Sequence, residues 1–271
     1  MKKIKSLISY IILILVSMIF IFPVLWVVVT SLKESGQVIG SYEFLLEKFN
    51  FENYKNAWQA ANFSRQFLNS FIVAVSVTLG QILTSVLAGY ALARMEFKGR
   101  KVVFMTVLAT LIIPYHILVV PLFVMLSQLG WINTYQGLIV PMLANGFGIY
   151  LFRQFFMKVP WELEEAAAVD GASRWKTLWK VVFPAAWPAA GTLFIFTFIA
   201  EWNNLFKWLI FTDSTRMRNV QLGLSVYQEQ FATNYVQLMA AVIIVTVPVL
   251  ILFILGQKKL IQGISIGGVK K

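Results

Sequence analysis

Residues 160–184 read PWELEEAAAVDGASRWKTLWKVVFP and lie between two long apolar stretches. Pro160 suits the first position of a helix, and Gly171 suits the position just after a helix end. The acidic residues near the start are favoured by the helix dipole, and the alanines that follow are strong helix formers. The segment therefore predicts a short helix, a turn at Gly171, and a second short helix over 173–182 before Pro184.

The apolar stretches on either side of this segment are part of a longer series. A helix needs about 20 predominantly apolar residues to cross the hydrocarbon core of a bilayer. Such stretches occur at approximately residues 7–30, 67–93, 102–126, 136–156, 184–210 and 238–255. The fourth contains Pro141, Asn145, Gly146 and Gly148, and buried membrane helices tolerate Gly and Pro. We therefore predict an all-α polytopic protein with six transmembrane helices, forming a single domain over residues 1–271.

Composition supports a membrane protein and excludes several classes of site. Of the 271 residues, 59% are hydrophobic and 13% are charged, which is too little charge for the surface of a soluble protein. The chain has no cysteine and a single histidine, His116, so we expect no metal site and no catalytic triad. It also lacks the Gly-x-x-x-x-Gly-Lys-Ser/Thr loop that binds ATP phosphates. We therefore expect no enzyme activity and no bound cofactor.

Basic residues are concentrated in alternate loops of the predicted topology. If the N-terminus is inside the cell, the inner segments carry sixteen basic and five acidic residues, and the outer segments carry seven of each. The whole net charge of +11 then lies on one side, as the positive-inside rule predicts for cytoplasmic loops. We predict a cell-membrane protein with cytoplasmic N- and C-termini. The basic excess therefore requires no nucleic-acid partner.

The loop between the fourth and fifth stretches carries a spaced motif. Glu165-Ala166-Ala167 is followed after three residues by Gly171, and after nine more by Val181-Val182-Phe183-Pro184. This pattern, on the basic side between the fourth and fifth spans, resembles the EAA signature of ATP-binding-cassette (ABC) importer permeases. Val181 and Phe183 replace the usual Ile and Leu of that signature.

Further segments resemble one branch of these permeases, the carbohydrate importers of the maltose-permease type. The segments that carry this resemblance are Phe22–Trp26, Thr30–Lys33, Asn69–Ser70, Gly89–Arg94, Asp170–Ala172 and Glu201–Asn204. The resemblance covers nearly the whole chain. It implies a permease subunit of a carbohydrate ABC importer, with a cytoplasmic EAA coupling-helix loop over residues 157–183.

The resemblance also implies partners and a mechanism. The chain would pair with a second permease subunit and with two ATP-binding ABC subunits, and an extracytoplasmic solute-binding protein would deliver the sugar. The EAA helix would sit in a cleft of an ATP-binding subunit, whose ATP-driven closure would turn both permeases from inward-open to outward-open. Glu165 would pair with a basic residue of that subunit, although Glu164 competes for this role and a solvated acid would suit either position. The implied ATPase-coupling residues are Glu164, Glu165, Ala166, Ala167, Asp170, Gly171 and Ala172.

Polar residues within the spans are candidates for the substrate path. They are Asn145, Glu201, Trp202, Asn203 and Asn204. Glu201 lies 17 residues beyond Pro184, which is roughly 25 Å along a helix and close to the outer interface. The asparagines could bond sugar hydroxyl groups, and Trp202 could stack on a sugar ring. Alternatively, Glu201 could be an interfacial anchor beside Trp202, with Lys207 snorkelling to water, and Asn145 could bond a neighbouring helix.

Two other functions stay open on the sequence. Permeases for glycerol phosphate or another small solute resemble the sugar group closely. An ion-coupled secondary transporter would need carboxylates within the membrane, and Glu201 alone lies near the interior of a span. The sequence does not specify which sugar would be transported.

Overall fold

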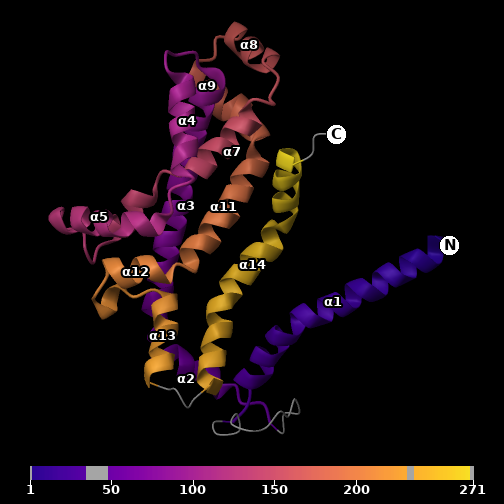
Figure 1. The fold of residues 1–271 in the computed structure, drawn as a ribbon, viewed down its shortest axis with the longest axis vertical. Coiled ribbons are helices and arrows are strands. Elements are labelled where there is room, and N and C mark those ends of the chain that lie inside the picture. The colour runs from indigo at the N-terminus through magenta and orange to yellow at the C-terminus, as the bar shows by residue number, and fades with distance from the viewer. Residues whose placement is uncertain (1, 35–47, 231–234, 269–271) are drawn as a thin grey trace. The chain divides into compact units, whose positions relative to one another are not determined.

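The computed structural model describes residues 2–34, 48–230 and 235–268 (Figure 1). Within these ranges the chain is helical with no strand, so the all-α prediction is confirmed for the described residues. The chain divides into two compact units, and each is described by itself. The first unit consists of Met1–Gln66 and Val220–Pro248, and the second of Phe67–Asn219 and Val249–Lys271.

Side-chain hydrogen bonds to main-chain carbonyls hold the helices of the first unit together. Its helices are α1 (Lys2–Ser31), α2 (Glu52–Ala60), the start of α3 (Phe63–Arg94), α13 (Val220–Gln230) and the start of α14 (Tyr235–Gly268). The amide of Asn53 donates to the carbonyls of Ser31 and Lys33, at 2.9 Å each. The buried Tyr227 hydroxyl donates to the carbonyl of Ala57. These bonds tie α2 to the end of α1 and to α13.

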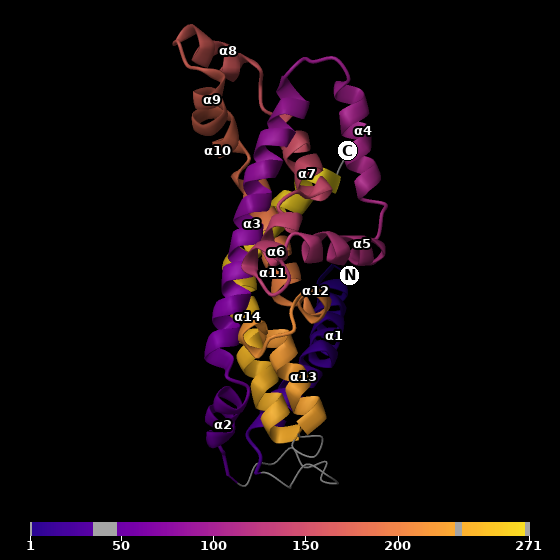
Figure 2. The same cartoon turned by 90° about the vertical axis from the view of Figure 1, so that its left-hand side faces the viewer.

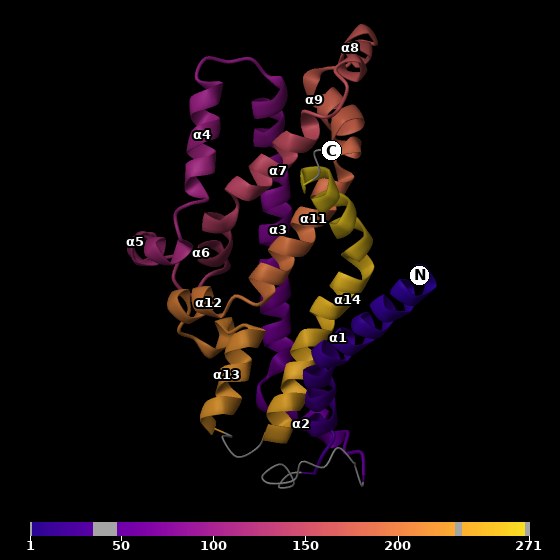
Figure 3. The ribbon, with the colours of Figure 1, turned by 45° about the vertical axis from the view of Figure 1, so that its right-hand side comes forward.

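The second unit holds most of the helices and both candidate sites. It contains the remainder of α3 and α14, α4 (Arg100–Thr110), α5 (Tyr115–Gln128), α6 (Tyr135–Ile139), α7 (Gly146–Phe156), α8 (Glu162–Val169), α9 (Arg174–Thr177), α10 (Phe183–Ala185), α11 (Trp187–Trp202) and α12 (Leu205–Phe211). Short 3₁₀ turns cover Val140–Met142 and Thr215–Met217, and a π-helical turn covers Leu178–Val182. Figures 2 and 3 show α4 returning beside α3, with α5 turned away from α4.

The apolar core of the second unit forms where α3, α7 and the segment from α9 to α11 pack together. Its buried residues are Val86, Tyr90, Phe152, Phe155, Phe156, Val159, Leu178, Val182, Ala186, Ala189, Ala190 and Leu193. At Gly89 the two backbones come close, because a Cβ atom there would lie 2.8 Å from the Phe152 Cβ and 3.0 Å from the Arg153 amide nitrogen. A glycine is therefore required for α3 and α7 to pack at this distance.

Among the residues that the structure describes, three single helices are long and apolar enough to cross a membrane, by length and composition. They are Ser6–Ser31, Phe63–Arg94 and Tyr235–Gln257, in agreement with the first, second and sixth predicted spans. The other three predicted spans, 102–126, 136–156 and 184–210, are interrupted in the structure and are not continuous helices. Two bent helix pairs, Arg100–Thr110 with Tyr115–Gln128 and Arg174–Ala185 with Trp187–Trp202, are also long and apolar enough if each pair is one span. The total of six spans therefore stays a prediction.

Each break has a local cause. The third stretch bends by 98° between α4 and α5, where Pro114 lacks a donor and disfavours helical geometry at the residue before it. In the fourth, a 3₁₀ turn containing Pro141 is followed by Asn145 in an extended conformation. The fifth bends by 77° at Ala186, just before Pro188, and α12 restarts after the extended Asn204.

Candidate functional site

The helix–turn–helix loop, residues 157–183, forms as its sequence predicts. Gly171 follows α8 with φ +74°, a conformation in which a Cβ would strain the backbone. The Ser173 hydroxyl accepts a hydrogen bond of 3.3 Å from the Lys176 amide and caps α9. The predicted second helix over 173–182 is α9 continued by the π-helical turn. The predicted order of helix, glycine turn and helix is thus confirmed.

The two neighbouring glutamates of α8 have different surroundings. Glu164 Oε1 lies 3.0 Å from Arg94 Nε, and the Tyr90 hydroxyl donates to Glu164 Oε2 at 2.9 Å. Arg94 and Glu164 are nearly buried, with side chains 8% and 10% exposed, whereas Glu165 is exposed. Of the two glutamates that compete for the contact with a partner, only Glu165 is therefore accessible on this surface.

Arg94, at the last position of α3, connects three parts of the second unit. Its guanidinium donates to the carbonyls of Phe156 and Val159, just where α7 ends. It also lies 5.1 Å from the centre of the Trp161 ring, which precedes α8. We call Tyr90, Arg94 and Glu164 the Arg94 clamp. The clamp borders a cavity of about 180 Å³ that Glu165, Ala168, Ala172, Arg174 and Thr177 also line.

The other predicted coupling residues lie around the exposed side of this loop. Ala166, Asp170 and Gly171 are exposed, Ala172 is half-buried, and Ala167 packs inward. Large apolar side chains share the exposed side, namely Trp161, Leu163, Val169 and Trp175, of which Val169 is 88% exposed. The loop thus presents exposed apolar side chains together with exposed acids, among them Glu165 and Asp170, a composition suited to contact with another protein.

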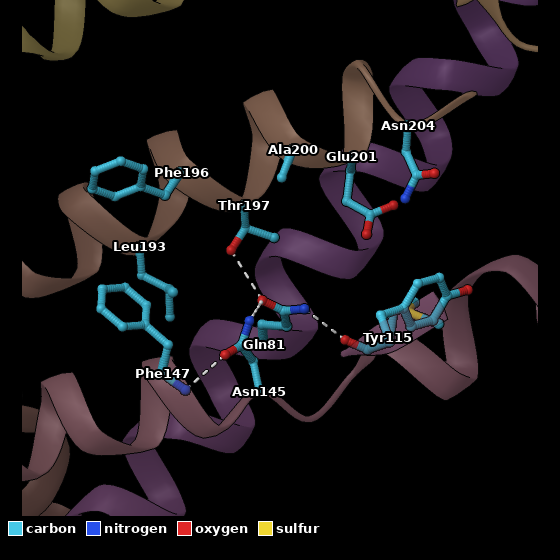
Figure 4. Close-up of a pocket in the computed structure, with 11 residues that line it drawn as sticks. Gln81, Tyr115, Asn145, Phe147, Leu193, Phe196, Thr197, Ala200, Glu201 and Asn204 are labelled. Carbon is cyan, nitrogen blue, oxygen red and sulfur yellow. Dashed lines mark hydrogen bonds between the residues drawn. The ribbon is translucent and has the colours of Figure 1, made fainter. Parts of the chain in front are cut away.

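A second site is a cavity of about 700 Å³ beside α11, which we call the α11 cavity (Figure 4). Its lining includes three of the predicted path residues, Asn145, Glu201 and Asn204. The remaining lining residues are Gln81, Tyr115, Met142, Phe147, Leu193, Phe196, Thr197 and Ala200. None of these eleven described residues is Lys or Arg. The lining is therefore largely apolar, with amide and hydroxyl groups and one carboxylate.

Gln81 connects three elements at the wall of the α11 cavity. Its Oε1 accepts hydrogen bonds from Asn145 Nδ2 at 3.1 Å and Thr197 Oγ1 at 3.0 Å, and its Nε2 donates to the Met142 carbonyl at 2.8 Å. Asn145 Oδ1 also accepts from the amide of Phe147 at 2.8 Å and so caps α7. The helix–helix hydrogen bond considered for Asn145 is present, and the residue lies on the cavity wall as well (Figure 4).

Glu201 is part of a buried ion pair where α11 ends. Lys207 Nζ contacts Glu201 Oε2 and donates to the Leu138 carbonyl at 3.2 Å. Lys207 is fully buried, so the alternative in which it snorkels to water is wrong. The physical reason is the break after Trp202, which turns α12 so that Lys207 faces Glu201.

The remaining path candidates have other surroundings. Trp202 is buried and packs against the rings of Phe67 and Phe198, with centroids 5.5 and 5.6 Å away. Asn203 is exposed, and neither Trp202 nor Asn203 lines the α11 cavity. Asn204 lines it and also caps α12, since its Oδ1 accepts from the Lys207 amide at 3.0 Å. The structure thus brings together three of the five predicted path residues.

Sequence reasoning missed several residues at both sites. Gln81, Thr197 and Tyr115 were not among the predicted path residues, yet all three line the α11 cavity. Arg94 was noted as a cytoplasmic charge and as the end of the segment Gly89–Arg94, but its contact with Glu164 was not predicted. The signal available in the sequence was the position of Arg94. An Arg in the last turn of a helix that ends on the cytoplasmic side can reach an acidic residue of the next cytoplasmic loop. In the described part of the chain, no group of three or more His, Asp or Glu residues is placed to hold a metal.

Comparisons with known proteins agree over most of the chain. Residues 81–266 match the family model described as binding-protein-dependent transport system inner membrane component. The chain is 36% identical to the diacetylchitobiose uptake system permease protein NgcG of Streptomyces coelicolor, covering 96% of this chain and 87% of that protein. It is also 36% identical to the trehalose/maltose transport system permease protein MalG of Thermococcus litoralis, covering 95% and 94%.

A solved structure has a similar fold. It is a chain from the crystal structure of a bacterial ABC transporter involved in the import of the acidic polysaccharide alginate. The TM-score is 0.83 at 23% sequence identity, and the match covers 94% of this chain and 96% of that chain. At this identity the likeness is one of fold.

Proposed function

Because this chain belongs to the family of binding-protein-dependent transport system inner membrane components, we propose that it forms half of a sugar translocation pathway in an ABC importer. It is a non-enzymatic membrane component, and ATP hydrolysis in a partner subunit drives uptake. The observation that carries this proposal is the accessible helix–turn–helix loop, with Glu165 exposed beside a glycine turn at Gly171. The similarity to two disaccharide permeases over nearly their full lengths supports it.

The proposed assembly includes a second permease subunit, two ATP-binding subunits and an extracytoplasmic solute-binding protein. We propose that residues 1–271 act as one permease domain with six spans and cytoplasmic N- and C-termini. The positive-inside distribution of Lys and Arg supports this orientation. The loop at 157–183 then lies on the cytoplasmic side, where it meets an ATP-binding subunit.

The α11 cavity is the proposed part of the substrate path in this subunit, with Asn145, Glu201 and Asn204 on its wall. Its described lining contains no Lys or Arg, and the nearby Lys207 is paired with Glu201. A phosphate ester would be expected to meet Arg or Lys groups, which bind phosphate strongly. The lining therefore favours an uncharged sugar over glycerol phosphate. Trp202 and Asn203 do not line this cavity and are not part of the proposed path.

The test is uptake by proteoliposomes that contain this chain, its partner permease, the ATP-binding subunit and the binding protein. We expect uptake of labelled trehalose, maltose or diacetylchitobiose that requires both ATP and the binding protein. Gly171→Asp strains the left-handed turn, and Glu165→Lys reverses the exposed charge. Each is expected to lower uptake about tenfold or more, a typical size for loss of coupling between sites. Glu96→Lys, at an exposed acid outside the loop, is the matched control.

Three results would contradict this proposal. Uptake without the ATP-binding subunit, or uptake driven by a proton or sodium gradient, would indicate a secondary transporter. Uptake of glycerol 3-phosphate in preference to every sugar tested would replace the substrate class. To check that the variants still assemble, the complex is pulled down through the ATP-binding subunit and the permease that is recovered with it is measured.

A further inference from the structure

We propose that the Arg94 clamp makes α3 a direct mechanical connection between the helix–turn–helix loop and the α11 cavity. This inference rests on the proposed function, in which the loop receives the movement of an ATP-binding subunit. Tyr90, Arg94 and Glu164 are positioning residues in this connection. They hold α8 against the end of α3 and do not contact the substrate.

The connection through the chain itself is interrupted between the loop and α11. After α9 the chain passes through the π-helical turn Leu178–Val182 and then a 77° bend at Ala186. Both features change the direction of the helix axis, so a displacement of the loop is not passed straight along α11. The chain segment from α9 to α11 therefore transmits a displacement of the loop poorly.

Helix α3 offers an uninterrupted path. It is one helix over 32 residues, Phe63–Arg94, and carries both the clamp and Gln81. Gln81 precedes Arg94 by thirteen residues, which corresponds to roughly 20 Å along a helix axis. Because a continuous helix moves as a rigid rod over this length, a shift at Arg94 is reproduced at Gln81.

Both ends of this rod are held by several contacts. At the loop end, Arg94 binds Glu164 and two carbonyls at the end of α7, and several donors of a planar guanidinium fix its orientation. At the cavity end, Gln81 bonds Asn145 before α7 and Thr197 on α11. Movement of α8 therefore reaches two walls of the α11 cavity at once (Figure 4).

A distance measurement tests this connection directly. The native chain has no cysteine, so spin labels can be placed at Val169→Cys on α8 and Leu83→Cys on α3. Both side chains are exposed, at 88% and 47%. In the full complex, with cysteine-free partner subunits, the distance is measured by electron paramagnetic resonance with and without ATP and vanadate. We expect the same distance in both states, because the two labels move together.

Charge variants of the clamp provide the comparison. Arg94→Glu and Glu164→Arg are each expected to broaden or shift the label distance on addition of ATP and vanadate. The same variants should lower sugar taken up per ATP hydrolysed by about tenfold, while hydrolysis itself continues. The double variant Arg94→Glu/Glu164→Arg restores two opposite charges but not the bonds from Arg94 to the carbonyls of Phe156 and Val159. It should therefore recover part of both measurements relative to either single variant, as expected for directly interacting residues. Glu96→Arg is the control on the same loop end.

The outcomes separate this inference from the proposed function. A label distance that changes in the native clamp, or a double variant that shows no recovery, would overturn the clamp as a rigid connection. If the native complex shows no ATP-dependent uptake, the proposed function fails instead. If Arg94→Glu does not assemble, Arg94→Gln keeps some hydrogen bonds without the charge and serves in its place.

Discussion

Two buried ion pairs in the second unit have contrasting geometries. Arg94 and Glu164 are 70 residues apart in the sequence and join the end of α3 to α8. Glu201 and Lys207 are six residues apart and join the end of α11 to α12. The first pair connects two separate elements, and the second fixes the angle of a local break.

The two pairs also differ in how completely their side chains are buried. The side chains of Arg94 and Glu164 are 8% and 10% exposed, and those of Lys207 and Glu201 are 0% and 9% exposed. The guanidinium of Arg94 has additional carbonyl and aromatic partners, whereas Lys207 depends on Glu201 and one carbonyl. We expect the Lys207 pair to matter more for stability because it is the more deeply buried, and the Arg94 clamp to matter more for the proposed coupling because it joins separate elements.

The largest expected effect comes from breaking the local pair. Lys207→Met keeps the length of the side chain but leaves the Glu201 carboxylate buried without its cation. Removing one partner of a buried pair typically costs about 3–5 kcal/mol. We expect a large fall in the thermal midpoint of the purified complex. Lys98→Met, at an exposed lysine, is the control.

The double variant Lys207→Met/Glu201→Gln removes both charges and should recover most of that loss. If Lys207→Met alone has the same midpoint as Lys98→Met, the buried pair does not stabilise the break and the contrast between the pairs disappears.

A smaller effect is expected from the cap of α12. Asn204→Ala removes the Oδ1 acceptor of the Lys207 amide, and loss of such a cap costs about 1 kcal/mol. Because Asn204→Ala leaves the ion pair of Lys207 and Glu201 in place, the midpoint should fall less than in Lys207→Met. Asn204→Asp keeps an acceptor and should retain the midpoint. Equal losses in the alanine and aspartate variants would show that the cap is not the cause.

The smallest effect is expected in the clamp. Tyr90→Phe removes one hydrogen bond to Glu164 and leaves the ion pair, at a cost of about 1 kcal/mol or less. We expect little change in the thermal midpoint but a measurable fall in uptake per ATP hydrolysed. Tyr150→Phe, on the exposed side of α7, is the control. A change in midpoint without a change in coupling would reverse the roles assigned to the two pairs.

The sequence predicted the parts of the fold that depend on local pattern. Long apolar runs gave the positions of α1, α3 and α14, and Gly171 indicated the turn between α8 and α9. The breaks in the helices in the middle of the chain were harder to predict from the sequence. Pro114 and Pro141 were visible, but whether a proline bends or ends a membrane helix depends on the neighbouring groups that bond the freed backbone.

The sites were predictable only in part, because they depend on pairings between distant segments. Adjacent residues of a helix face directions about 100° apart, so the sequence showed that Glu164 and Glu165 differ in orientation. Which of them packs inward was decided by Arg94, 70 residues earlier. In the same way Trp202 has a side chain suited to stacking on a sugar, but its ring packs against Phe67.

The short separation of Glu201 and Lys207 has a consequence for how the protein is made. Both residues belong to one apolar segment, so their charges can neutralise each other as soon as that segment has been synthesised. An unpaired charge in an inserting helix is unfavourable, by about 2.5–3.5 kcal/mol at the helix centre and by less toward the interface, where Glu201 is predicted to lie. The segment can therefore enter the bilayer as an electrically neutral unit, without waiting for another helix to supply the opposite charge.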